Sequence, residues 1–77
     1  MKLIQVLGTG CPKCEKLEAL TRQAARELDL ECEVLKVKDI QAIMHMGVMM
    51  TPALAVDGVV KVSGRVPSLD EIKKLIQ

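Results

Sequence analysis

Residues 8–14 read Gly8-Thr9-Gly10-Cys11-Pro12-Lys13-Cys14, and this stretch separates two different hydrophobic patterns. Before it, residues 2–7 (KLIQVL) are mostly apolar, which is typical of a central strand covered on both faces. After it, apolar residues recur at helical spacing, at Leu17, Leu20, Ala24 and Leu28. Because proline is well tolerated in the first turn of a helix, Pro12 marks where this helix begins. The C-x-x-C motif is therefore predicted at a loop-to-helix junction, with Cys11 at the helix N-terminus.

Two further elements follow the first helix. Residues 31–37 (ECEVLKV) predict a second strand, and the strand-helix-strand order requires a right-handed crossover between parallel strands. Asp39 is a suitable N-cap for a short helix that extends to about Met46 and ends at Gly47.

The rest of the chain predicts a hairpin and a last helix. After Thr51-Pro52, residues 53–56 and 59–62 flank an Asp-Gly turn, which is a strong hairpin signal. Ser68 and Glu71 have the spacing of a capping box at the start of the final helix. The predicted order is β-α-β-α-β-β-α, an α/β fold with a four-stranded mixed sheet flanked by three helices. Residues 1–77 are expected to form a single domain.

The composition excludes several classes of function. Eleven Lys and Arg against ten Asp and Glu give a net charge of +1, which argues against an electrostatic nucleic-acid binder. The chain has no Phe, Tyr or Trp, so base-stacking platforms and aromatic cages are excluded. No apolar stretch has the length of a signal segment or a membrane span, and we expect a cytoplasmic monomer without a membrane partner.

The cysteines point to redox or metal chemistry. Three are present, an odd number that makes a poor framework for a disulfide-stapled secreted domain. Because the thiolate is the reactive species, the position of Cys11 at a helix N-terminus should activate it. Pro12 stiffens the turn and Lys13 adds positive potential. The hypothesis is that Cys11 attacks a substrate disulfide and that Cys14, one helical turn away, resolves the mixed disulfide.

The motifs G-x-G-C-P-K-C, M-T-P-A-L and V-D-G, with a later glycine, resemble the thioredoxin-fold superfamily. The sequence is most similar to its small thioredoxin-like or glutaredoxin-like redox proteins, over essentially the whole chain. The resemblance implies a cis Thr51-Pro52 bond beside the disulfide, with Thr51 presenting its backbone to substrate. Gly64 matches a glycine that lets substrate approach closely.

The resemblance also implies an activity and partners. It implies a thiol–disulfide oxidoreductase that reduces protein disulfides and receives electrons from a thioredoxin reductase that contains flavin. No prosthetic group is expected, because the dithiol itself carries two electrons. The chain departs from thioredoxins at two positions: Gly10 replaces an aromatic residue, and Gln5 replaces a buried acid.

Two other functions remain open at this point. The C-x-x-C could belong to a copper or zinc carrier, although the chain ends on a helix and has no second C-x-x-C to complete a zinc site. The domain could also be a redox-gated interaction module whose partner recognises the oxidised loop without turnover.

The remaining residues of interest have ordinary alternatives. Cys32 is expected to be an inert strand residue, with a regulatory thiol on an edge strand as the functional alternative. His45 is expected to be a solvated bystander. Core filling is the default for the methionines, Met44, Met46, Met49 and Met50. The sharper hypothesis is a docking surface that includes Met50, since Met49 and Met50 directly precede Thr51-Pro52.

Overall fold

The computed structural model describes residues 1–77 and contains one sheet of four strands in the order β2-β1-β3-β4. The strands are β1 (Lys2–Leu7), β2 (Cys32–Val37), β3 (Ala53–Val56) and β4 (Val59–Ser63). β1 pairs in parallel with β2 and antiparallel with β3, which pairs antiparallel with β4. The predicted mixed sheet of an α/β fold is therefore confirmed.

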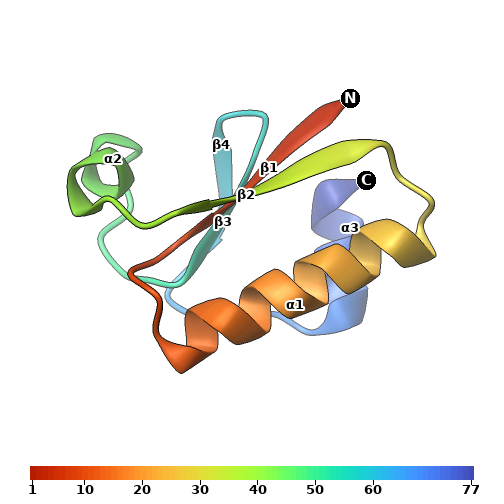
Figure 1. Ribbon diagram of the computed structural model, residues 1–77, viewed down its shortest axis with the longest axis horizontal. Helices are drawn as coiled ribbons and strands as arrows, with labels where there is room; N and C mark the ends of the chain where they lie inside the picture. Colours follow the sequence, from red (N-terminus) through yellow and green to blue (C-terminus); the bar gives the residue numbers. More distant parts are fainter.

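Three helices pack around this sheet: α1 (Pro12–Glu27), α2 (Ile40–His45) and α3 (Leu69–Ile76). α1 and α3 lie together on one face, whereas α2 lies near the end of the sheet where α1 begins (Figure 1). The two ends of the chain lie at the opposite end, and there the Lys2 ammonium donates a hydrogen bond of 2.8 Å to the Ile76 carbonyl.

Two separate groups of buried apolar side chains hold these layers together. Since successive strand residues point to opposite faces, Val6 and Leu7 of β1 belong to different groups. The α1/α3 core contains Ile4, Val6, Leu17, Ala24, Ala25, Leu54, Val56, Val62, Ile72 and Ile76. The α2 core contains Leu7, Ile43, Val48, Ala53 and Ala55. As predicted for a central strand, β1 supplies both cores.

Local capping signals fix where the helices begin. The Asp39 carboxylate accepts a hydrogen bond of 3.0 Å from the Gln41 backbone N–H at the start of α2. The Ser68 hydroxyl accepts one of 3.2 Å from the Glu71 N–H at the start of α3. The capping box is only half formed, because the Glu71 carboxylate pairs with the Arg65 guanidinium instead.

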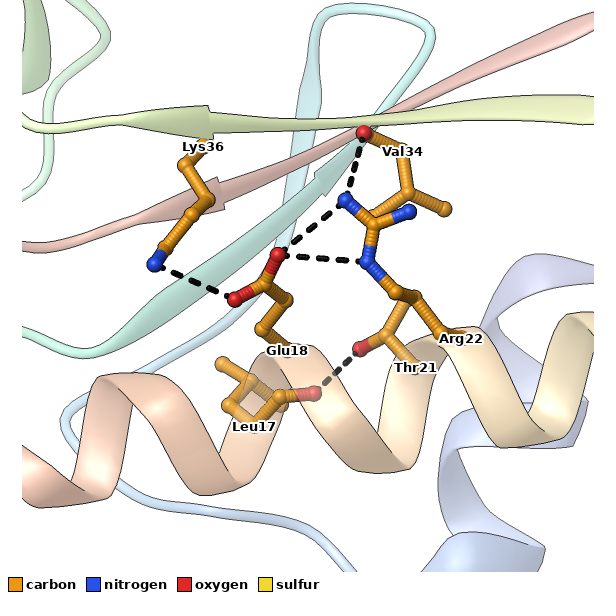
Figure 2. A network of polar contacts seen from close by, with 6 residues as sticks. All are labelled: Leu17, Glu18, Thr21, Arg22, Val34 and Lys36. Carbon is orange, nitrogen blue, oxygen red and sulfur yellow. Dashed lines mark hydrogen bonds and ion pairs between the residues drawn. The ribbon is translucent and has the colours of Figure 1, made fainter.

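A network of ion pairs attaches α1 to the edge strand β2 (Figure 2). The Glu18 carboxylate lies 3.0 Å from the Arg22 guanidinium and 3.2 Å from the Lys36 ammonium. Arg22 also donates a hydrogen bond of 3.3 Å to the Val34 carbonyl. These contacts connect the surface of α1 to β2, beside the buried apolar contacts that hold the helix on the sheet.

Candidate active site

The two cysteines of the C-x-x-C motif lie where β1 ends and α1 begins. Cys11 is the N-cap residue of α1, with extended backbone (φ −70°, ψ 163°), and Pro12 is the first helical residue. The Cys11 side chain makes no capping hydrogen bond, so the first N–H groups of α1 are left to interact with a negative charge near the helix end. The predicted loop-to-helix junction is thus present.

The two thiols face each other but differ in exposure. Their Sγ atoms are 2.7 Å apart, and both cysteines are free. Cys11 is half-buried, whereas only 2% of Cys14 is exposed. Cys11 is therefore the cysteine of the pair that is open to solvent.

The surroundings shift the two pKa values in opposite directions. The hydrogen bond from Cys14 is the main cause that lowers the pKa of the Cys11 thiol, and the backbone N–H groups of Cys14 and Lys13 lower it further. Burial raises the pKa of the Cys14 thiol, and its hydrogen bond with Cys11 raises it further. Lys13 acts here through its backbone, and its side chain is exposed. The pair is therefore a half-buried thiol of lowered pKa beside a buried thiol of raised pKa.

Gly8 is a site residue that the sequence analysis interpreted only as the end of a strand. A Cβ atom at this position would lie 2.2 Å from the Cys14 Sγ and 3.9 Å from the Thr51 Cβ. No side chain fits there without displacing the sulfur. Its position directly after β1 indicates that Gly8 lies near the C-x-x-C motif. The requirement for glycine, however, depends on the packing of Cys14 and Thr51 against it.

The loop before β3 adjoins the dithiol through the same glycine. The Thr51-Pro52 peptide bond is cis, Pro52 is buried and Thr51 is exposed. The Pro52 carbonyl accepts a hydrogen bond of 2.9 Å from the Gly64 N–H. Gly64 has a φ of +81°, and a Cβ atom there would lie 3.3 Å from the Met50 Cβ. The structure therefore places Thr51 beside Cys14, and Met50 against Gly64.

The default prediction for the methionines, core filling, is wrong. The exposed fractions are 67% for Met44, 97% for Met49 and 66% for Met50. Only Met46 packs against the α2 core, and it is half-buried. The physical reason is the shortness of α2, which has six residues and buries only Ile43. Met49 and Met50 follow α2 in the segment before β3, outside any helix or strand.

Other residues singled out from the sequence lie away from the dithiol. Cys32 begins the edge strand β2 and packs, half-buried, against the α1/α3 core. His45 is exposed at the end of α2. Gln5 is half-buried in β1, between Leu35 of β2 and Ala55 of β3.

The structure brings together no group of three or more His, Cys, Asp or Glu side chains that could hold a metal ion. Cys11 and Cys14 are thus two thiol ligands without a third beside them. None of the helices has the length and apolar character needed to cross a membrane.

Comparisons with known proteins agree with this geometry. The family model of the thioredoxin domain matches residues 2–77. A thioredoxin of Methanothermobacter thermautotrophicus is 45% identical over 76 residues, which cover 99% of each chain. A thioredoxin of Methanocaldococcus jannaschii is 39% identical over 74 residues, which cover 96% of this chain and 85% of that protein. These matches span the chain from β1 to α3.

Proposed function

The chain belongs to the thioredoxin family and is a thiol–disulfide oxidoreductase, and we propose that it reduces disulfides of other proteins through Cys11 and Cys14. The family matches confirm the resemblance found in the sequence. One observation carries the proposal: an accessible thiol of lowered pKa lies 2.7 Å from a buried thiol of raised pKa. This asymmetry supports different roles for the two cysteines, with Cys11 attacking and Cys14 resolving.

The first step is an attack by Cys11. Its thiolate attacks one sulfur of the substrate disulfide, a new S–S bond joins Cys11 to the substrate, and the other substrate sulfur leaves as a thiolate. The N-terminus of α1 and the Cys14 thiol both stabilise negative charge on Cys11. Pro12 fixes the backbone of this first turn, and the backbone N–H of Lys13 contributes to the lowered pKa of Cys11.

The second step releases the reduced substrate. Cys14 loses its proton to water and attacks the Cys11 Sγ, the S–S bond between Cys11 and the substrate breaks, and the second substrate sulfur leaves as a thiolate that takes up a proton from water. Two electrons have passed to the substrate, and Cys11 and Cys14 are joined in a disulfide. Because the Cys14 thiol is buried and its pKa is raised, it stays protonated until the mixed disulfide has formed.

The surface beside the dithiol is where an extended substrate segment would bind. We assign Met50, Thr51, Pro52 and Gly64 to substrate binding. Thr51 is exposed next to Cys14, and Gly64 leaves room beside Met50. The backbone of Thr51 would form hydrogen bonds with the substrate chain on one side of the disulfide.

The cycle requires an external reductant but no prosthetic group. We propose a reductase of the thioredoxin reductase type as the electron donor and the cytoplasm as the compartment, since a reducing compartment keeps such a dithiol reduced. The Cys11–Cys14 pair then alternates between dithiol and disulfide and carries two electrons per turnover.

A redox titration of metal-free protein tests this proposal. The protein is equilibrated with different ratios of reduced and oxidised dithiothreitol, its thiols are trapped by alkylation, and the disulfide is mapped by mass spectrometry. We expect one two-electron transition at about −200 to −300 mV, confined to Cys11 and Cys14. The matched control is Cys32→Ser, which should leave this transition unchanged. Scrambled pairing through Cys32, or no discrete transition, would contradict the proposal.

A further inference from the structure

An exposed apolar surface on α2 and on the segment that leads to Thr51-Pro52 is not explained by the chemistry of the two cysteines. Between Asp39 and Asp57 the chain contains no Asp, Glu, Lys or Arg. We define the methionine surface as the exposed apolar side chains of this segment, Ile40, Met44, Met49 and Met50. Apolar side chains that gather on a surface in this way mark interaction sites more often than chance exposure does.

This surface contains a pocket. Met44, Gly47, Val48 and Met49 line a pocket of about 380 Å³. Val48 forms the buried floor, with an exposed fraction of 4%, and Met49 is almost fully exposed. Methionine side chains are flexible and polarizable, so they adapt to apolar groups of different shapes. The pocket therefore fits one apolar side chain of a partner.

The pocket lies close along the chain to the place where a substrate must bind, because Met49 lines it and Thr51 follows two residues later. Any substrate disulfide has to reach Cys11, and Thr51 lies beside Cys14 across Gly8. Met49 is two residues from Thr51, so their Cα atoms are at most about 7 Å apart. In an extended substrate segment, residues i and i+2 point to the same side and are separated by a similar distance. A side chain two residues from the attacked cysteine can thus reach the pocket.

We propose that the methionine surface selects substrates, and that its pocket binds an apolar side chain two residues from the attacked substrate cysteine. This inference rests on the proposed function, because it names the class of protein disulfide that the dithiol reduces. A charged side chain at that substrate position would lose water in a pocket whose lining residues, Met44, Gly47, Val48 and Met49, offer no ion-pair partner. The selection is therefore for apolar residues and against charged ones.

Three heptapeptides provide the test: Gly-Leu-Ser-Cys-Ser-Leu-Gly and its analogues with Ser or Glu in place of both Leu residues. Each cysteine is joined by a disulfide to thionitrobenzoate, whose release by reduced protein is followed by its colour. We expect the second-order rate constant for the Leu peptide to exceed that for the Ser peptide by about tenfold. The Glu peptide should be the slowest of the three.

The variant M44Q/M49Q keeps the length of both side chains and makes them polar. We expect it to reduce the ratio of the Leu to the Ser rate constant to within about twofold of one. The readout is a ratio measured on one protein, so a general change in Cys11 reactivity cancels. The matched control is Val59→Thr, which alters an exposed apolar residue of β4 outside the surface and should keep the tenfold ratio.

Reduction of hydroxyethyl disulfide by the wild-type protein distinguishes a failure of this inference from a failure of the proposed function. If this small disulfide is reduced but the Leu peptide has no advantage, or if M44Q/M49Q keeps the advantage, the inference is wrong and the proposed function stands. If hydroxyethyl disulfide is not reduced either, both are wrong. Light scattering measures whether a second copy of the chain occupies the surface instead. If the wild-type protein is a dimer, M44Q/M49Q is a monomer and the peptide ratio is unchanged, the surface is a dimer interface and the inference is wrong.

Discussion

The face of the sheet under α1 and α3 buries ten apolar side chains, whereas the face under α2 buries five. α1 has 16 residues and α3 has 8, so together they cover most of their face, while the six-residue α2 leaves much of its neighbourhood open. The exposed Met44, Met49 and Met50 belong to α2 and to the segment between α2 and β3, and α1 begins at the end of the sheet near α2 (Figure 1). The contrast indicates that one face supplies most of the stability and leaves the other free to serve recognition.

The largest expected effect comes from matched isoleucine truncations on the two faces. Ile72 of α3 is fully buried between α1 and the sheet, and Ile72→Ala should lower the free energy of unfolding by about 4 kcal/mol. Ile43 of α2 is also buried, but a six-residue helix can shift into the space left behind, so Ile43→Ala should cost about 2 kcal/mol. Urea unfolding followed by far-ultraviolet circular dichroism measures both values. Equal losses in the free energy of unfolding would show that the two faces do not differ in their contribution to stability.

A substitution at the border between the site and the sheet should have the next largest effect. In Gly8→Ala, the new Cβ collides with the Cys14 Sγ, and we expect a loss of about 2 kcal/mol of stability. The displaced Cys14 should also react faster with iodoacetamide in the folded protein. The control is Gly47→Ala, where no atom lies within 4 Å and only the positive φ is unfavourable, at about 1 kcal/mol. Unchanged Cys14 protection in Gly8→Ala would show that the sheet, not the sulfur, gives way.

The two cysteines also differ in burial, and this difference should appear in the pH dependence of their alkylation rates. The pKa of Cys11 is lowered, so its alkylation rate should rise with pH and level off at a lower pH than that of a free cysteine. Cys14 has a raised pKa and should react only at higher pH. The hydrogen bond from Cys14 is the main cause at Cys11, so Cys14→Ala should move the Cys11 profile to higher pH. Mass spectrometry of each alkylated cysteine measures the profiles, and an unmoved Cys11 profile would point to the helix N-terminus instead.

The smallest effect is expected at the ion pairs of Glu18, which lie on the surface of the molecule on the side of α1. The hydrogen bonds from Lys36 and Arg22 outweigh the effect of burial and lower the pKa of the Glu18 carboxyl. The pairs therefore stabilise the fold at neutral pH, and this contribution is lost as the pH falls through the lowered pKa. Glu18→Gln should cost about 0.5 kcal/mol at neutral pH and less in acid. The control is Glu33→Gln, which removes an exposed carboxylate of β2 without an ion pair; a similar loss there would assign the effect to net charge.

Local signals explain why the elements could be predicted from the sequence. Pro12 begins α1, Asp39 and Ser68 cap α2 and α3, and the Asp-Gly turn joins β3 to β4. Each signal depends on a few neighbouring residues, so no knowledge of the tertiary structure is needed to interpret it. Glu71 shows where such local signals fail. Its carboxylate accepts a hydrogen bond from Arg65 of the preceding loop and so does not complete the capping box.

The parts of the site that the sequence analysis missed depend on packing between distant segments. Gly8 is required because Cys14 and Thr51, from two other segments, pack against it. The exposure of Met49 depends on how little of the sheet α2 covers, and composition alone favours burial of an apolar side chain. The positions of Cys11 and Cys14, by contrast, follow from their spacing and from Pro12.

The hydrogen bond from Lys2 to the Ile76 carbonyl brings both ends of the chain to the end of the sheet that lies away from Cys11. A linker, a fluorophore or a solid support attached at either end would therefore leave the dithiol facing outward. Fusions in both orientations should keep the reactive sulfur accessible, so the domain can be tethered without choosing between its N-terminal and C-terminal sides.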